Sequence, residues 1–152
     1  MAHIFQINTS PGGLPKHGMV QAEVTEQGII GDQHRDLVHH GGPDRALCLY
    51  PLEHIQVLQA EGHPVFPGAM GENLTLAGVA WGQIIPGARI KLGDSVVLEV
   101  TDFTVPCNHL KPFFLQENIS RVGQKIYPGW SRVYARVIQG GTIKVGDKFE
   151  FL

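Results

Sequence analysis

Cys107 and His109 are the residues best suited to nucleophilic or soft-metal chemistry. Cys107 follows Thr104-Val105-Pro106 and precedes Asn108-His109-Leu110. Because proline cannot donate a hydrogen bond to a strand ladder, the preceding strand should end near Pro106 and leave Cys107 at the rim of a sheet. A neighbouring imidazole, or the start of a helix expected over 111–119, would favour the reactive thiolate. The spacing alone leaves open whether Cys107 is reactive or inert.

Cys48 has a different setting, inside the apolar run Ala46-Leu47-Cys48-Leu49-Tyr50. A thiol among such neighbours usually behaves as a small buried apolar group. Two cysteines do not make a disulfide framework, so we expect two free thiols in a reducing, cytoplasmic setting. The first residues do not resemble a signal peptide, and no apolar run approaches the roughly 20 residues of a membrane helix.

Segments 31–34 and 39–45 combine histidines, aspartates, glycines and an arginine ahead of an expected buried strand. Backbone N–H groups at Gly41-Gly42 could bind an anion, and Arg45 could bind a phosphate or carboxylate through two hydrogen bonds. A solvated loop, in which Asp44 and Arg45 only stabilise the turn, is an equally good interpretation. A zinc site is a third: His34 with His39 or His40, completed by Cys107 or His109.

The composition describes the domain that must position these residues. The chain has 152 residues, 43% hydrophobic and 17% charged, with a formal net charge of -2. We therefore expect one domain over 1–152 and no nucleic-acid partner, because no basic surface is indicated. Nineteen glycines and ten prolines occur as scattered turn pairs. Turns at this density predict many short strands, and closure into a barrel is a common way to protect their edges.

Apolar periodicity predicts the individual elements. Strands are expected around 4–7, 20–24, 45–50, 73–76, 89–92, 96–101 and 132–138, with two more within 142–152. Helices are expected over 51–61 and 111–119. The phrases Leu92-Gly93-Asp94 and Val145-Gly146-Asp147 predict hairpin turns in which glycine takes a positive φ.

Motifs along the whole chain resemble the MOSC domain, which is found at the C-terminus of molybdenum-cofactor sulfurases and as stand-alone bacterial proteins. The resemblance is closest to the short stand-alone members. The motifs are Gly31-Asp32-Gln33-His34, His40-Gly41-Gly42-Pro43-Asp44-Arg45-Ala46, Met70-Gly71-Glu72-Asn73-Leu74, Gly87-Ala88-Arg89-Ile90, Gly93-Asp94, Leu98-Glu99-Val100-Thr101, Pro106-Cys107, Tyr134-Ala135-Arg136-Val137 and Gly146-Asp147.

The resemblance implies a mainly β fold, a closed β-barrel of MOSC type with a few short α-helices. It places the family's cysteine at Cys107, as a persulfide carrier or molybdenum ligand, with His109 beside it. The pterin molybdenum cofactor, molybdopterin, would be bound by residues of the loops and strand ends: His34, His40, Gly41, Gly42, Asp44, Arg45, Glu72, Asn73, Arg89 and Arg136. Glu72 and Asn73 could equally anchor a turn. Pyridoxal phosphate (PLP) is not expected on this chain, because in the family it belongs to a fused domain.

Three functions follow from the resemblance. The chain is a cofactor-binding or sulfur-carrier protein that works with a sulfur-donor partner, or it is the cofactor-binding part of a reductase for N-hydroxylated compounds with a redox partner protein. The third is a non-catalytic β-barrel binding module. Each takes a pterin cofactor or a small-molecule substrate, and neither nucleic acid nor a membrane is expected.

Overall fold

The computed structural model describes residues 1–33 and 42–152 and consists mainly of short strands. This confirms the mainly β class and the turn density from which it was predicted. The strands are β1 (His3–Thr9), β2 (His17–Met19), β3 (Gln21–Thr25), β4 (Gly28–Ile29), β5 (Leu47–Pro51), β6 (Leu74–Ala77), β7 (Arg89–Leu92), β8 (Val96–Phe103), β9 (Val133–Gln139), β10 (Gly141–Lys144) and β11 (Phe149–Phe151).

Helical segments in the described part of the chain are few and short. They are the α-helix α1 (Leu52–Ala60) and the 3-10 segments η1 (Pro43–Arg45), η2 (Trp81–Gln83), η3 (Asn108–Phe113), η4 (Leu115–Glu117) and η5 (Ile119–Val122). In residues 1–33 and 42–152, no helix has the length and apolar character needed to cross a membrane.

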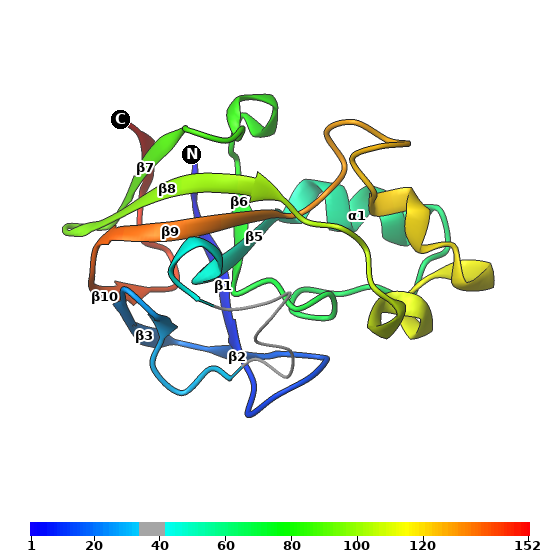
Figure 1. Cartoon of the computed structure of the whole chain (residues 1–152), viewed down its shortest axis with the longest axis horizontal. Helices are drawn as coiled ribbons and strands as arrows, with labels where there is room; N and C mark the ends of the chain where they lie inside the picture. The colour runs from blue at the N-terminus through cyan, green and yellow to red at the C-terminus, as the bar shows by residue number, and fades with distance from the viewer. Residues whose placement is uncertain (34–41) are drawn as a thin grey trace.

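The strands form an eight-stranded sheet, ordered β11-β7-β8-β9-β5-β6-β1-β2, and a three-stranded sheet, ordered β10-β3-β4 (Figure 1). Only β5 and β6 run parallel, because α1 connects them; the other described pairs are antiparallel. The pairings among the described residues do not close into a barrel, so the predicted closure is not confirmed. The physical reason is that residues 2–4 and 146–149 meet through a few backbone hydrogen bonds and one bridge, His3 with Lys148, instead of a full ladder.

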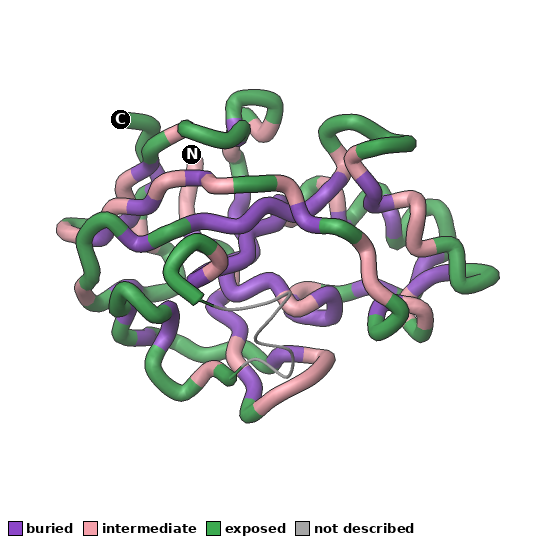
Figure 2. The backbone as a smooth tube through the Cα atoms, in the orientation of Figure 1, coloured by how far each residue is buried: buried purple, intermediate pink, exposed green. Residues whose placement is uncertain are grey.

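The main core lies between the two sheets. The small sheet contributes Val24, Ile29 and Ile143, which pack on the inward side chains of the large sheet, such as Leu98 and Leu49. Figure 2 shows the buried segments following β5 and β9 through the middle of the molecule. Each such side chain contributes roughly 1.5–3 kcal/mol when fully buried.

A second apolar cluster lies on the opposite face of β5, where α1 and η3 gather (Figure 1). Ile55 and Leu58 of α1 are fully buried against Tyr50 of β5, while the opposite side of the helix is exposed. The helix ends before Gly62, whose φ of +99° is unfavourable for other residues. The prediction of a helix over 51–61 is therefore confirmed.

The predicted helix over 111–119 is wrong. That stretch contains parts of η3, η4 and η5 instead of a continuous α-helix. Pro112 lacks the N–H that a helix interior needs, and Gln116 and Glu117 have positive φ values of 54° and 56°. Apolar spacing alone could not reveal these two left-handed residues.

The stacked rings of His54 and Trp130 hold α1 against the segment before β9. The His54 ring lies 4.0 Å from the Trp130 ring, nearly parallel to it. The Arg121 guanidinium lies 4.1 Å from the centre of the same indole. Burial and, to a smaller extent, the Arg121 charge lower the pKa of His54 to about 4, with Glu53 opposing them.

This stack predicts a loss of stability in mild acid. Between pH 6.5 and 4 the unfolded chain binds a proton at His54 that the folded chain excludes, so the free energy of unfolding falls as pH falls. We expect about 2 kcal/mol for this partly exposed ring. Urea unfolding at pH 7 and pH 4.5 measures it, and His54→Phe should reduce the pH dependence by that amount. An unchanged dependence in the variant would contradict the assignment.

Candidate functional site

Cys107 lies on the segment that leaves β8, immediately before η3. Its backbone is extended, with φ of -117° and ψ of 163°, and its carbonyl accepts a hydrogen bond from the Leu110 N–H at 3.0 Å. The side chain is partly exposed and packs against the second apolar cluster. The thiol is therefore held on an ordered segment and remains accessible from one side. His109 follows on η3 and is exposed.

Cys48 is the buried thiol of the pair. It lies within β5, opposite Tyr134 of β9, and is 8% exposed. Burial raises the pKa of Cys48 to about 11, and the nearby Arg132 cation only partly opposes this rise. The prediction that Cys48 is a small buried residue is confirmed.

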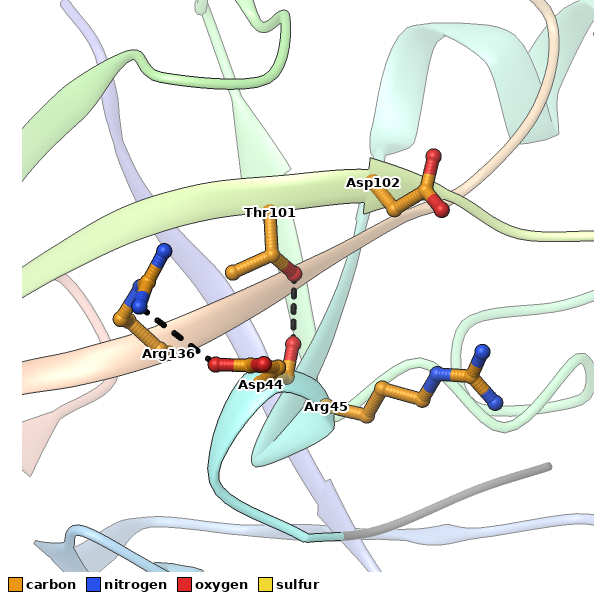
Figure 3. Close-up of a pocket in the computed structure, with 5 residues that line it drawn as sticks. All are labelled: Asp44, Arg45, Thr101, Asp102 and Arg136. Atoms are coloured by element: carbon orange, nitrogen blue, oxygen red, sulfur yellow. Dashed lines mark hydrogen bonds and ion pairs between the residues drawn. The ribbon is translucent and has the colours of Figure 1, made fainter. Parts of the chain in front are cut away.

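A shallow pocket of about 270 Å³ lies where η1 packs on β8 and β9 (Figure 3). Its lining consists of Asp44, Arg45, Thr101, Asp102 and Arg136. The Thr101 hydroxyl donates to the Asp44 carbonyl at 2.5 Å, and Arg136 lies 3.5 Å from the Asp44 carboxylate. Figure 3 shows the Arg45 side chain extending away from Asp44 and Arg136. The structure thus brings together three of the predicted binding residues, Asp44, Arg45 and Arg136.

The carboxylate of Glu99 engages two of the predicted cations. Arg89 Nε donates to one Glu99 oxygen at 2.8 Å, and Arg136 Nη2 lies 3.0 Å from the other. The hydrogen bond from Arg89 and the charge of Arg136 hold the pKa of Glu99 below its usual range. Arg89 is thereby placed on the β7 side of Glu99, and it does not line the pocket.

Tyr134 lies beside Arg45 of this pocket and opposite Cys48 of β5. Its ring lies 5.2 Å from the Arg45 guanidinium carbon, and β9 places it between Cys48 and Asp102 on the neighbouring strands. Burial and the Cys48 thiol raise the pKa of Tyr134 to about 12, with a smaller contribution from Cys107. The positive charges of Arg132 and Arg45 partly oppose this rise in the pKa of Tyr134.

Glu72 and Asn73 are fully buried at the entrance to β6. The Asn73 amide oxygen accepts from the Cys48 N–H at 2.9 Å, and its NH₂ group donates to Asp32 at 2.8 Å. These bonds anchor the chain, which is the structural alternative considered for Asn73. One Glu72 oxygen accepts from Thr75 at 3.2 Å, while Oε1 has no partner among the described residues. Burial raises the pKa of Glu72, opposed chiefly by the Gly68 N–H.

Sequence reasoning missed three buried charged residues here. The Lys16 ammonium lies 2.6 and 2.7 Å from the two Asp32 oxygens, with side-chain exposures of only 6% and 2%. Arg132, immediately before β9, is 3% exposed. The sequence predicted a strand around 132–138, but a strand prediction could not show that Arg132 would be covered.

The loop carrying Gly68 supports these groups and gives a test. Gly68 has a φ of +92°, and an added Cβ would overlap the Lys16 carbonyl oxygen. Gly68→Ala is expected to lower the free energy of unfolding by more than about 1 kcal/mol. Gly87→Ala is the matched control, since Gly87 has a φ of +94° and open space at its Cβ. If the two variants lost equal amounts of unfolding free energy in urea, the overlap at Gly68 would have to be relieved by a shift of the neighbouring backbone.

The remaining predicted residues are distributed as follows. His34, His40 and Gly41, with His39 of the zinc interpretation, lie outside the described residues, and Gly42 is the residue that caps the start of η1, with a φ of 80°. Within residues 1–33 and 42–152, no group of three or more His, Cys, Asp or Glu side chains is placed to hold a metal ion. The zinc interpretation therefore receives no support from the described side chains.

Comparison with known proteins adds independent information. The MOSC domain family matches residues 36–150. The uncharacterized protein YflK of Bacillus subtilis is 38% identical over 124 residues, covering 80% of this chain and 54% of its own length. A protein of Gibberella moniliformis named "Reductase" is 33% identical over 130 residues, covering 82% of this chain and 22% of its own length. The chain thus spans about half or less of these curated relatives.

The fold comparison agrees. The crystal structure of YiiM from Geobacillus stearothermophilus superimposes with a TM-score of 0.74 and 26% identity, covering all of this chain and 75% of that structure. The overall fold is therefore shared with a solved protein.

Proposed function

This chain belongs to the MOSC domain family, and on that premise we propose that it binds the pterin molybdenum cofactor or carries sulfur, with Cys107 as the reacting group. One observation carries the proposal: of the two thiols, Cys107 is partly exposed on an ordered segment, whereas Cys48 is buried. Only an accessible thiolate can act as a nucleophile or as a soft metal ligand.

Several polar groups of the described residues suit such a cofactor, although Cys107 itself does not line the pocket. A pterin dithiolene carries a phosphate and a polar heterocycle, and the site offers the Arg45 cation beside a pocket of about 270 Å³. Buried polar atoms without partners among the described residues, Arg132 Nε and Nη2 and Glu72 Oε1, could also pair with a polar ligand. Cys107 would hold the metal, and His34, His40 and Gly41 remain predicted contacts. When bound, the cofactor supplies a metal centre for electron or sulfur transfer.

Sulfur carriage needs no external oxidant or reductant. The Cys107 thiolate attacks the outer sulfur of a persulfide on a donor protein. The S–S bond of the donor breaks as a new S–S bond forms on Cys107, and the donor leaves as a thiolate. The partly exposed position of Cys107 suits this exchange, which requires the two proteins to meet at that residue.

A second candidate is the cofactor-binding part of a reductase for N-hydroxylated compounds. The similarity to the Gibberella protein named "Reductase" favours it. In this function Cys107 would remain a metal ligand and a redox partner protein would supply the electrons. Either function suits a reducing, cytoplasmic setting, which keeps both thiols free.

Metal and pterin analysis of the purified protein tests the proposal. The chain is produced in molybdenum-supplied cells and purified without chelators. We expect molybdenum and pterin in about equal amounts, or a persulfide on Cys107 detected by mass spectrometry of alkylated peptides. A protein with neither would be the non-catalytic binding module. Zinc in place of molybdenum would support the zinc interpretation, with His34 and His39 or His40 as ligands.

A further inference from the structure

Arg132 has an unusual environment for a fully charged side chain. It is 3% exposed, and its Nη1 donates to the Met70 carbonyl at 2.8 Å. Neither Nε nor Nη2 has a hydrogen-bond partner among the described residues, and the neutral Cys48 thiol is near enough for the guanidinium to lower its pKa. These two N–H groups form the side edge of the guanidinium, whose parallel hydrogens match the two oxygens of a carboxylate or phosphate.

Two further buried oxygens without partners lie on neighbouring elements. Thr104 is next to Arg132 across the β8–β9 pair, where the Thr104 N–H donates to the Arg132 carbonyl at 3.0 Å. Side chains of directly opposed residues share one face of a sheet. Thr104 is 2% exposed, and its hydroxyl is unpaired within the described part of the chain. Glu72 Oε1 is the other unpaired oxygen, and the Glu72 carboxyl is close enough to be influenced by the Arg132 charge.

The positive charge of Arg132 favours a bound anion over a bound water molecule. Arginine stays protonated in proteins, and a buried cation without a counter-charge is strongly unfavourable. No described carboxylate lies within the 4.0 Å of an ion pair with Arg132. A water molecule would satisfy the hydrogen bonds but leave the charge uncompensated, whereas an oxyanion satisfies both.

We propose that Arg132 and Thr104 form an oxyanion-binding subsite for a carboxylate or phosphate group of the ligand. Arg132 holds two oxygens through Nε and Nη2, and the Thr104 hydroxyl donates to the anion. The subsite lies three residues before Cys107 along the chain, so it would orient the anionic part of a ligand whose reactive part meets the thiol. This deepens the proposed function, on which it rests for the identity of that ligand.

Binding of inorganic phosphate, measured by calorimetry at constant ionic strength, tests the subsite. Arg132→Lys keeps the charge but removes the parallel N–H pair, and we expect its phosphate Kd to rise about tenfold or more. Thr104→Val keeps the shape but removes the hydroxyl, and a rise of about threefold is expected. Lys125→Gln, which changes an exposed cation, should leave the Kd unchanged. Equal Kd values in all four proteins would overturn the proposal.

A crystal grown with selenate gives a second readout that needs no variant. The expected result is anomalous scattering from selenium within hydrogen-bond distance of Arg132 Nε and Nη2. An ordered water at that position, with selenate only on exposed residues, would overturn the subsite. If the wild-type protein retains molybdenum but binds no phosphate at Arg132, this inference alone is rejected. If phosphate binds at Arg132 but Cys107 has no role in metal or sulfur binding, the proposed function alone is rejected.

Discussion

Replacing Cys107 with Ala is expected to reduce molybdenum retention and persulfide loading by about 100-fold or more, because the residue supplies either the ligand or the nucleophile. The fold should survive, since Cys107 is only partly buried at the edge of an apolar cluster. Metal analysis and mass spectrometry of the alkylated protein measure the two losses. Circular dichroism verifies that the variant is folded.

Cys48→Ala provides the matched control. Cys48 is buried, and burial raises the pKa of its thiol to about 11, so little thiolate forms at neutral pH. We expect this variant to keep its molybdenum or persulfide at wild-type levels while losing some stability to the small cavity. If Cys48→Ala lost the sulfur or metal and Cys107→Ala kept it, the roles assigned to the two thiols would have to be exchanged.

Asp32→Ala is expected to cause the largest loss of stability, about 3–5 kcal/mol, because it leaves a buried ammonium without its counter-charge. Lys16 and Asp32 are almost fully covered and lie 2.6 Å apart. Asp32 also accepts hydrogen bonds from the Ser10 N–H at 3.0 Å and the Asn73 amide at 2.8 Å. The free energy of unfolding in urea, compared with wild type at pH 7, measures the loss.

An exposed ion pair is the control for this prediction. Lys148 and Glu150 lie 3.1 Å apart, but their side chains are 61% and 46% exposed. Glu150→Ala should therefore change the free energy of unfolding by less than about 1 kcal/mol. A similar small effect of Asp32→Ala would mean that Lys16 reaches water or a new partner once the carboxylate is gone.

The sequence predicted most of the fold where pattern and local chemistry agree. Strand β7 has the predicted limits Arg89–Leu92, and α1 lies within the predicted range. Gly93 and Gly146 have the positive φ expected of the two hairpin turns. The short strands β2 and β4 were not predicted, because they have only three and two residues, too few to show an alternating pattern, although each pairs with the strand just before it.

The candidate site was less accessible to prediction. The resemblance to the MOSC family indicated Cys107, and the structure places it on an accessible segment. Arg132 and Lys16 could not be recognised, because their importance comes from burial, which depends on tertiary packing and not on residue type. For Asn73 the sequence left a ligand contact and a structural anchor equally open; the structure shows its hydrogen bonds to the Cys48 N–H and to Asp32.

The hydrogen bonds between residues 2–4 and 146–149 have a consequence for synthesis of the protein. Gly146 N–H donates to the Ile4 carbonyl at 2.8 Å, and Phe149 N–H donates to Ala2 at 3.0 Å. These contacts span almost the whole chain, so they cannot form until residue 149 has emerged from the ribosome. Until then β1 has no partner on that side near its start, and its exposed backbone can pair with another nascent chain. The chain should therefore depend on chaperones most strongly in the interval before residues 146–149 emerge.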